Sequence, residues 1–310
     1  MSGVQHYLDR ERPVAYNHNG ESMSTNDTYA GYAAQRGLNW SRLKRARTSA
    51  LHFHETPPRP DTSTLGMLRA VHNLVLEPEN FDRDFAVFTG KTRRGKAFDE
   101  FVEQHAGKTI LNMREHTQAL ETAAGVLAYR PAVELLQSSD TRTEVGLQWT
   151  DEATGQKCKG RADLVHMPDG TREAREAWVV DLKTVQSCSP RQMAAAAARM
   201  GYHGQLEHYA AGVEATTGRT VTRVGLLCVE GAAPHDCALL WLDDEARDAG
   251  RALRDRLLQT VAEATERNVW PGQVPEAAEL TLPAWAVDEA HGFDDDFTST
   301  STSTGEYGDA

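Results

Sequence analysis

The feature that most constrains the fold is a valine-rich run at residues 177–185, AWVVDLKTV, which carries two charged side chains. Its apolar, β-branched composition is typical of a strand buried inside a sheet. Because side chains along a strand alternate between faces, Asp181 and Lys183 point to one face and Leu182 to the other. Charges in a buried strand cost free energy unless they are paired or bind a metal ion. The run therefore predicts a central strand with a polar, functional patch on one face.

The segments around this run predict a mixed sheet between helices. Residues 143–151 and 157–167 are two short extended runs separated by a Gly-containing turn, which is the pattern of a β-hairpin. Asp163 lies on the second run and can reach the face that carries Asp181. The order of helices, three strands, a helix, two strands and a helix predicts an α/β fold with a central mixed β-sheet flanked by helices. The other predicted elements are helices at 65–77, 95–107, 114–129, 191–218 and 243–268, and strands at 221–231 and 235–243.

The two ends of the chain differ in composition from its middle. Residues 1–30 are polar and lack periodicity, which predicts a mobile N-terminal segment. Residues 288–310 are acidic and rich in Ser and Thr, which predicts a disordered tail. We find neither a linker nor an internal repeat between them, so we expect a single domain over residues 31–287.

The formal net charge of −12 argues against a protein that coats nucleic acid, because phosphate binding rests on Lys and Arg. The charge is uneven, however. Basic residues cluster at 40–50 and again at 90–98, where Arg93 and Arg94 are adjacent. Each cluster is compatible with a DNA contact and equally with an ordinary solvated face.

The lack of a recognisable targeting signal and the spacing of the cysteines predict a cytoplasmic protein. No apolar run approaches the roughly 20 residues of a membrane-spanning helix, and the first residues lack the apolar core of a signal peptide. We therefore expect a cytoplasmic protein without a membrane partner. The four cysteines form no CxxC pair, so we expect reduced, packed thiols and no zinc or iron–sulfur site.

Two carboxylates and an ammonium on one face suit metal-assisted hydrolysis of a phosphodiester. Mg²⁺ prefers oxygen ligands, so Asp163, Asp181 and a backbone carbonyl can hold it while open positions take phosphate and water. Lys183 can orient and acidify that water and offset charge on the phosphate. Gln205 and Tyr209, at i and i+4 on the following helix, can hydrogen-bond to the same region. Asp181 and Lys183 also fit a structural ion pair at the end of a strand. Gln205 and Tyr209 also fit an ordinary polar pair on a surface helix.

Three blocks in this order resemble the PD-(D/E)XK nuclease superfamily: GRAD at 160–163, VVDLKT at 179–184 and QLEHY at 205–209. The last resembles the subset with a Q-x-x-x-Y helix. More closely, the chain resembles the RecE-type exonucleases (exonuclease VIII) of bacteriophages and prophages. The blocks LRAVHNLVLEPENFDRDF, KCKGRADLV, YHGQLEHYAAG and the closing WPG and LTLPAWA extend this resemblance over residues 38–285. DLKT alone is weakly specific, whereas these blocks in this order are strongly specific.

The resemblance implies roles for the residues of the central strands. Asp163 and Asp181 match the family's metal-binding acids. The carbonyl of Leu182 would complete the metal ligands of the protein, and Lys183 matches the catalytic lysine. The expected cofactor is Mg²⁺.

The resemblance also implies roles for residues outside those strands. His72 matches a helix histidine that contributes to the metal site, although sequence alone favours an interior helix histidine. Imidazole is a poor ligand for magnesium and an acceptable one for manganese, so we expect Mn²⁺ to substitute for Mg²⁺. Gln205 and Tyr209 match the motif helix. Glu144 lies where relatives often have an acid, and is a candidate for supporting the metal ligands indirectly.

The reaction is likewise implied by the resemblance. RecE-type enzymes digest one strand of linear double-stranded DNA from its 5′ end and leave a 3′ overhang, which a single-strand annealing recombinase coats. They form rings that enclose DNA, and a ring-shaped homo-oligomer with a basic channel and an acidic exterior would accommodate the net charge. Arg93 and Arg94 are then predicted to line the DNA path or bind the 5′ phosphate. We also expect a phage- or prophage-encoded, stand-alone protein in a bacterial host cell.

Three alternatives stay open. The first is an endonuclease or a 3′-directed nuclease on the same fold, because active-site residues do not set polarity. The second is a catalytically inactive DNA-binding protein, against which the intact Asp163, Asp181 and Lys183 argue. The third is a small-molecule α/β enzyme, but the sequence has no GxGxxG, GxxxxGK[ST] or GxSxG motif. Without a phosphate loop, a requirement for ATP is not expected.

Overall fold

The computed structural model describes residues 15–16, 22–24, 29–57, 62–168 and 175–287. The chain divides into two compact units, Met1–Trp270 and Pro271–Ala310. All strands and helices named below belong to the first unit. The single domain over residues 31–287 stays a prediction, and the predicted tail at 288–310 lies outside the described residues.

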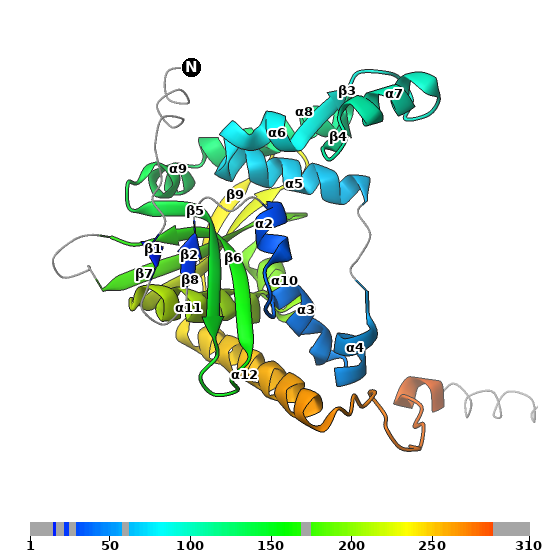
Figure 1. The fold of residues 1–310 in the computed structure, drawn as a ribbon, viewed down its shortest axis with the longest axis vertical. Coiled ribbons are helices and arrows are strands. Elements are labelled where there is room, and N and C mark those ends of the chain that lie inside the picture. The colour runs from blue at the N-terminus through cyan, green and yellow to red at the C-terminus, as the bar shows by residue number, and fades with distance from the viewer. Residues whose placement is uncertain (1–14, 17–21, 25–28, 58–61, 169–174, 288–310) are drawn as a thin grey trace, which may run out of the picture. The chain divides into compact units, whose positions relative to one another are not determined.

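A seven-stranded mixed sheet forms the centre of the first unit (Figure 1). Its order is β1-β2-β5-β6-β7-β8-β9, and all neighbours are antiparallel except β7 and β8, which are parallel. The strands are β1 (Ala15–Tyr16), β2 (Ser22–Ser24), β5 (Thr141–Thr150), β6 (Lys157–His166), β7 (Glu176–Val185), β8 (Thr220–Glu230) and β9 (Cys237–Trp241). The predicted hairpin, the central strand and the two later strands are confirmed.

Part of the segment predicted to be mobile, residues 1–30, belongs to this sheet. Strand β2 pairs with β5, with Ser22 opposite Gln148, and Met23 is buried. Three residues are too few for a sequence pattern to distinguish a strand from a polar loop. The other parts of the segment before α2, residues 1–14, 17–21 and 25–28, lie outside the described residues.

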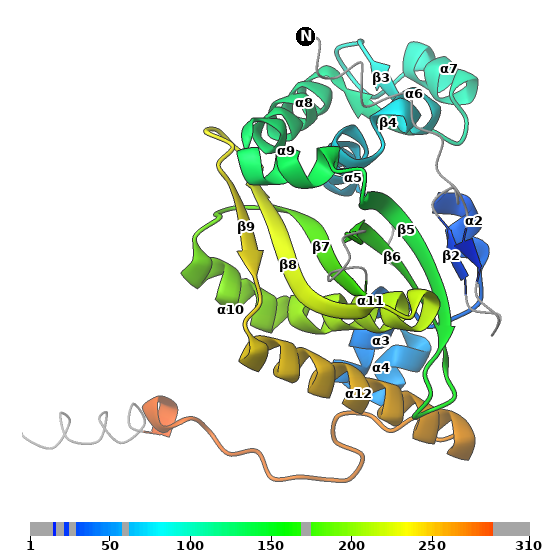
Figure 2. The ribbon, with the colours of Figure 1, turned by 90° about the vertical axis from the view of Figure 1, so that its left-hand side faces the viewer.

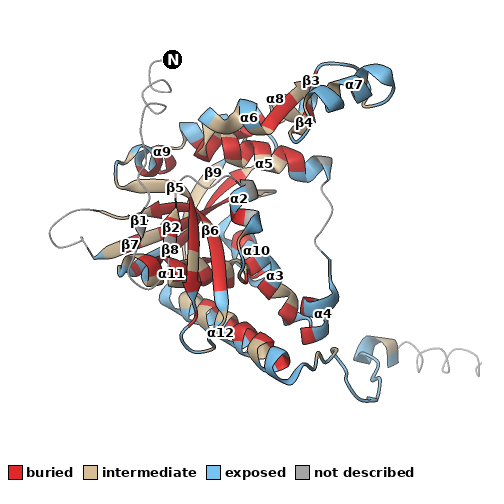
Figure 3. Ribbon diagram, in the orientation of Figure 1, coloured by how far each residue is buried: buried red, intermediate tan, exposed pale blue. Residues whose placement is uncertain are grey.

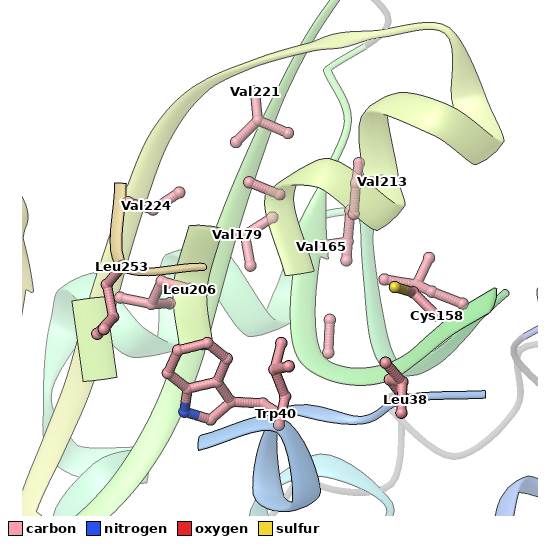
Figure 4. Close-up of a cluster of buried hydrophobic side chains, with 14 of the residues drawn as sticks. Leu38, Trp40, Cys158, Val165, Val179, Leu206, Val213, Val221, Val224 and Leu253 are labelled. Atoms are coloured by element: carbon pink, nitrogen blue, oxygen red, sulfur yellow. The ribbon is translucent and has the colours of Figure 1, made fainter. Parts of the chain in front are cut away.

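Helices cover both faces of the sheet (Figure 2). On one face α11 packs on the strands and α12 packs on α11, and the largest apolar core lies here, with Trp40, Val179 and Leu206 among its side chains (Figure 4). On the other face α5, α8 and α9 enclose a second core. Buried residues follow the sheet and the inner sides of these helices (Figure 3).

The helices are α2 (Tyr29–Ala34), α3 (Trp40–Leu43), η1 (Lys44–Arg47), α4 (Ala50–Glu55), α5 (Ser63–Leu76), η2 (Pro78–Asn80), α6 (Phe81–Asp84), α7 (Lys96–Gln104), α8 (Met113–Ala128), α9 (Arg130–Gln137), α10 (Pro190–Met200), α11 (Tyr202–Thr217) and α12 (Asp244–Arg267).

The single helix predicted at 191–218 is wrong, because α10 and α11 are separate helices. Gly201 between them has φ +74° and a Cβ there would lie 3.0 Å from Nη1 of Arg47. The Arg47 guanidinium donates to the carbonyls of Ala198 and Arg199 at 3.2 and 3.0 Å. Arg47, within the first basic cluster, therefore binds the C-terminal end of α10, a favourable place for a cation.

The N-terminal half is helical as predicted, with one exception. Strands β3 (Phe85–Phe88) and β4 (Thr109–Asn112) pair in parallel and form a separate two-stranded sheet. Each has only four residues, too few to show a period of two in the sequence. In the part of the chain that the structure describes, no helix is long and apolar enough to cross a membrane.

Candidate active site

Strands β6 and β7 bring the two predicted acids together. Leu164 lies opposite Val180, so Asp163 and Asp181 occupy the next position along each strand. An Asp163 carboxylate oxygen accepts a hydrogen bond from the backbone N–H of Leu182 at 2.7 Å. The two acids are only 8% and 1% exposed. Such burial of two neighbouring carboxylates requires compensating positive charge.

Lys183 supplies one such charge. Its ammonium forms an ion pair with Asp181 and lies 4.9 Å from the centre of the Tyr202 ring. Burial disfavours the charged lysine, but the carboxylates of Asp181 and Asp163 outweigh this effect and raise the pKa of Lys183. Lys183 is therefore protonated at neutral pH. It can orient water and offset charge on a phosphate.

Gln205 and Tyr209, both predicted site residues, reach the same acids from α11. The amide of Gln205 donates to Oδ1 of Asp181 at 3.1 Å and to the Tyr209 hydroxyl at 2.9 Å. Burial and the carboxylates of Asp181 and Asp163 raise the pKa of Tyr209 well above its usual value. A Cβ on Gly160 would lie 2.9 Å from the Tyr209 ring, so the glycine of the GRAD block makes room for that ring. The helix pair thus fixes the orientation of Asp181.

His72 of α5, Glu144 of β5 and Asp163 of β6 form a cluster that could hold a metal ion, since their ligand atoms all lie within 4.8 Å of one another. Burial, with a smaller contribution from Lys183, lowers the pKa of His72 to about 4. Its imidazole is neutral at pH 7, so its 3.6 Å approach to Asp163 is not an ion pair. A neutral imidazole and two carboxylates form a donor set that suits a divalent cation, manganese included.

The acids of this cluster are held against electrostatic repulsion. Burial raises the pKa of Glu144 to about 7. Burial, together with the nearby carboxylates of Asp181 and Glu144, raises the pKa of Asp163 well above its usual value. A divalent cation among them would remove this repulsion, so the residues present fit a metal ion.

The backbone at Glu144 is unusual and turns the side chain into the cluster. Thr143 pairs with Leu164 and Val145 with Ala162 without a change of register, so Glu144 lies opposite Asp163 on β6. Its φ of +51° is a left-handed conformation that costs a non-glycine residue free energy. Strain of this kind is often found at functional sites.

Arg161 stabilises Glu144 in this position. Its guanidinium bridges two carboxylates, with Nε 2.9 Å from Glu144 and Nη2 2.9 Å from Glu77 at the end of α5. All three side chains are 12–14% exposed. Arg161 therefore links the metal-site cluster to the segment that follows the histidine helix.

The cluster opens into a groove of about 1200 Å³. One side, the sheet wall, contains Glu144, Arg161, Asp163 and Lys183. The other side, the helical wall, comes from the segment that runs from α5 to β4. It contains Arg69, Arg83, Arg93, Lys108 and Thr109, together with the acids Glu77 and Asp84. Acids and cations therefore lie on both sides of the groove.

The two arginines predicted to contact DNA differ. Arg93 lines the groove, but its guanidinium binds the carbonyl of Ile110 at 2.9 Å and forms an ion pair with Glu115. Arg94 is exposed and is not among the described residues that line the groove. Arg93 therefore has a structural role at the start of α8 that the sequence did not reveal.

Sequence reasoning also missed Arg161, Glu77 and Tyr202 as members of the site. Arg161 lies inside the GRAD block and Glu77 inside the block LRAVHNLVLEPENFDRDF, so both were within the quoted motifs. Their pairing joins residues 84 positions apart, which periodicity cannot detect. The Leu182 carbonyl and Asp181 stay predictions as metal ligands, because Asp181 is bound by Lys183 and Gln205.

Comparison with known proteins gives a family for the chain. Residues 45–281 match the family described as "PDDEXK-like domain of unknown function (DUF3799)". No curated protein matches the chain. The predicted PD-(D/E)XK restriction-endonuclease-like fold is confirmed.

Solved structures support the same fold. A protein from Eubacterium rectale, described as a "Putative exonuclease", is 14% identical, with a TM-score of 0.53 over 87% of this chain and 100% of that chain. At this identity the similarity shows the fold alone. Two further structures carry no argument because their TM-scores are low. SSO0001 is 15% identical, with a TM-score of 0.28 over 76% of this chain and 87% of that chain. VC1899 from Vibrio cholerae is 9% identical, with a TM-score of 0.23 over 80% of this chain and 58% of that chain.

Proposed function

This chain belongs to the PDDEXK-like family DUF3799, and from that premise we propose that it is a metal-dependent exonuclease of the RecE type. It digests one strand of linear double-stranded DNA from the 5′ end and leaves a 3′ overhang. The observation that carries the proposal is the junction of Asp163, Asp181 and charged Lys183 with a neutral histidine at the base of a groove. Metal-assisted hydrolysis is the chemistry that such a donor set serves.

His72, Glu144 and Asp163 would hold a divalent cation, with Asp181 and the Leu182 carbonyl as further ligands. The bound ion, Mg²⁺ or Mn²⁺, would activate water and polarise the phosphate. Lys183 holds its proton, so it orients the water and offsets charge on a non-bridging phosphate oxygen. Gln205 fixes Asp181 in the orientation that this requires.

The helical wall supports a nucleic acid as the substrate. Arg69, Arg93 and Lys108 line the groove opposite the acids of the sheet wall, and cations in a groove attract a phosphate backbone. The overall charge of −12 is compatible with this because the cations are concentrated where the substrate would lie. We further propose a ring-shaped homo-oligomer, a single-strand annealing recombinase as partner, and a role in phage recombination in the bacterial cytoplasm. These last points rest on the RecE resemblance.

A digestion assay tests the function. Linear duplex labelled at either the 5′ or the 3′ end, with and without a 5′ phosphate, is incubated with Mg²⁺ or Mn²⁺ beside a covalently closed circle. We expect early release of the 5′ label and an intact circle. A nicked circle would instead identify an endonuclease, and early release of the 3′ label a 3′-directed enzyme. A purified protein inert with both metals would identify a non-catalytic DNA-binding protein.

A further inference from the structure

Helix α8 carries two apolar stripes, and the chain itself covers only one of them. The inner stripe is buried and consists of Ala119, Thr122, Ala123 and Val126. On the opposite side Met113, Leu120 and Leu127 are 49%, 45% and 47% exposed. The exposed residues Thr117 and Ala124 lie between them. We call these five residues the outer stripe: Met113, Thr117, Leu120, Ala124 and Leu127.

The spacing of the outer stripe is that of a helix–helix interface. Its members follow one another at alternating steps of four and three residues, which is the repeat of a coiled-coil seam. A helix that only covers a core needs one apolar face. The second face therefore calls for a second helix, which the chain does not provide among its described residues.

We propose that the outer stripe binds the outer stripe of a second copy of this chain, with the two α8 helices antiparallel. The charges beside the stripe support this partner. Arg114 and Glu121 are exposed and lie on the same flank of the stripe, seven residues apart. Glu121 also lies 3.9 Å from Nε2 of His235 in the same chain, and its side chain stays 61% exposed. In an antiparallel pair this flank meets itself, so Arg114 of each copy faces Glu121 of the other. In a parallel pair the flank would meet the side of His116 and Ala123, which offers no matching charge pattern.

The same register also matches side-chain sizes. A two-fold axis between Gln118 and Ala119 brings Arg114 of one copy to within two positions of the residue directly opposite Glu121 of the other. Leu127 lies beyond the overlap of the two helices in this register. The axis places Met113 opposite Ala124 and Leu120 opposite Thr117 of the second copy. Large side chains therefore meet small ones, which lets two helices interdigitate.

The size of this contact sets its strength. Sixteen residues of helix span about 24 Å, so one helix pair buries less than the ~800 Å² per partner of a standard stable interface. We therefore expect a reversible dimer with a dissociation constant on the order of micromolar. The contact does not depend on the proposed nuclease activity.

Sedimentation velocity of the full chain over a concentration series tests the interface. We expect the mass to rise with concentration, and Leu120→Arg to weaken association about tenfold or more by placing a charge in the seam. Leu51→Arg, at a 40% exposed leucine of α4, is the matched control and should associate like the wild type. If the wild type forms a larger assembly, Leu120→Arg must still reduce its mass. A wild type that stays monomeric up to ~100 µM, or an assembly indifferent to Leu120→Arg, overturns the proposal.

A charge swap tests the antiparallel register and guards against a folding defect. Glu121→Arg alone and Arg114→Glu alone each place like charges face to face, so both should weaken association. The double variant Arg114→Glu/Glu121→Arg restores opposite charges in the antiparallel register and should recover association. Far-UV circular dichroism and thermal unfolding show whether each variant is folded. A double variant weaker than both single variants, with the fold intact, rejects the antiparallel pairing.

Discussion

The sheet wall and the helical wall of the groove both carry charged side chains, but they hold them in different ways. On the sheet wall the charges bind one another, as in the Asp181–Lys183 pair and the Glu144–Arg161 pair. On the helical wall Lys108 donates to the carbonyl of Asp82 at 2.6 Å, and Arg69 to the Thr109 hydroxyl at 3.2 Å.

This difference predicts different responses to mutation. A sheet-wall charge is buried, so its removal leaves a partner charge without compensation and affects both chemistry and stability. Of the helical-wall cations, Arg83 pairs with Asp84 and Arg93 with Glu115. Lys108 instead donates to a backbone carbonyl, a neutral partner that does not offset its charge. Its removal should affect DNA binding more than chemistry.

The largest effect is expected at Lys183. Lys183→Met should reduce DNA digestion about 10³-fold or more, because it removes the charge that stabilises the phosphate. It should also destabilise the fold by about 3 kcal/mol by leaving Asp181 unpaired. Gel assays with Mg²⁺ and Mn²⁺ and urea unfolding measure the two effects. The double variant Asp181→Asn/Lys183→Met should regain stability but no activity, and substantial digestion by either variant would contradict the assigned role.

The next largest effect is expected at Arg161, which bridges Glu144 and Glu77. Arg161→Gln should reduce digestion about 10- to 100-fold and raise the metal concentration for half-maximal rate, because it releases Glu144 from its strained position. Arg161→Lys should rescue little, since an ammonium cannot bridge two carboxylates as a guanidinium does. Glu77→Gln, which leaves the Glu144 contact intact, is the milder control. An unchanged metal requirement in Arg161→Gln would separate this arginine from the metal site.

Metal binding on the sheet wall should depend on pH through Glu144. Its pKa is raised to about 7, chiefly by burial, so below pH 7 a metal ion must displace a proton. We expect the affinity for Mn²⁺ to fall about tenfold per pH unit below 7 for each proton released, and Asp163, whose pKa is also raised, can release a second one. Calorimetry at pH 6 and 8 without DNA measures this, and Glu144→Gln should bind more weakly with a flatter pH profile. If wild type and Glu144→Gln share one pH profile, another group controls binding.

The same raised pKa has a consequence for stability. A carboxyl whose pKa is higher in the folded than in the unfolded chain contributes stability below its ordinary value, near 4.5, and loses it as the pH rises through about 7. The contribution of Glu144 to the stability of the metal-free protein should therefore decline over this window. Bound Mn²⁺ should reverse the decline, which urea unfolding at pH 5 and 8 can detect.

The smallest effects are expected at Arg93 of the helical wall and at its exposed neighbour Arg94, which does not line the groove. Arg94→Ala should weaken DNA binding a few-fold, more at low salt, and leave stability unchanged, because the side chain is exposed. Arg93→Ala should also lower stability by about 1–2 kcal/mol because it removes the contacts to Ile110 and Glu115. Filter binding across a salt series and thermal unfolding separate the two. Charge reversal at both positions without effect on digestion would exclude both from the DNA path.

The sheet wall could be predicted from sequence because its order is local. Asp181, Leu182 and Lys183 follow the two-residue period of one strand, and Gln205 and Tyr209 follow the helical period. The position of Glu144 opposite Asp163 depends on the register between β5 and β6, which the period of a single strand does not give. The helical wall was predicted less well because its cations act through tertiary contacts, as Arg93 does with Ile110. The family resemblance identified His72, whose partners on β5 and β6 no local pattern reveals.

The pairing of β2 with β5 has a consequence for how the chain is made. The ribosome completes Ser22–Ser24 early, but their partners, Gly146–Gln148, emerge only after the whole helical half of the chain. Strand β5 meanwhile pairs with β6 on one side and leaves its other edge open. An open strand edge can pair with a neighbouring nascent chain. Slow pairing of β2 with this edge would therefore favour aggregation during rapid synthesis.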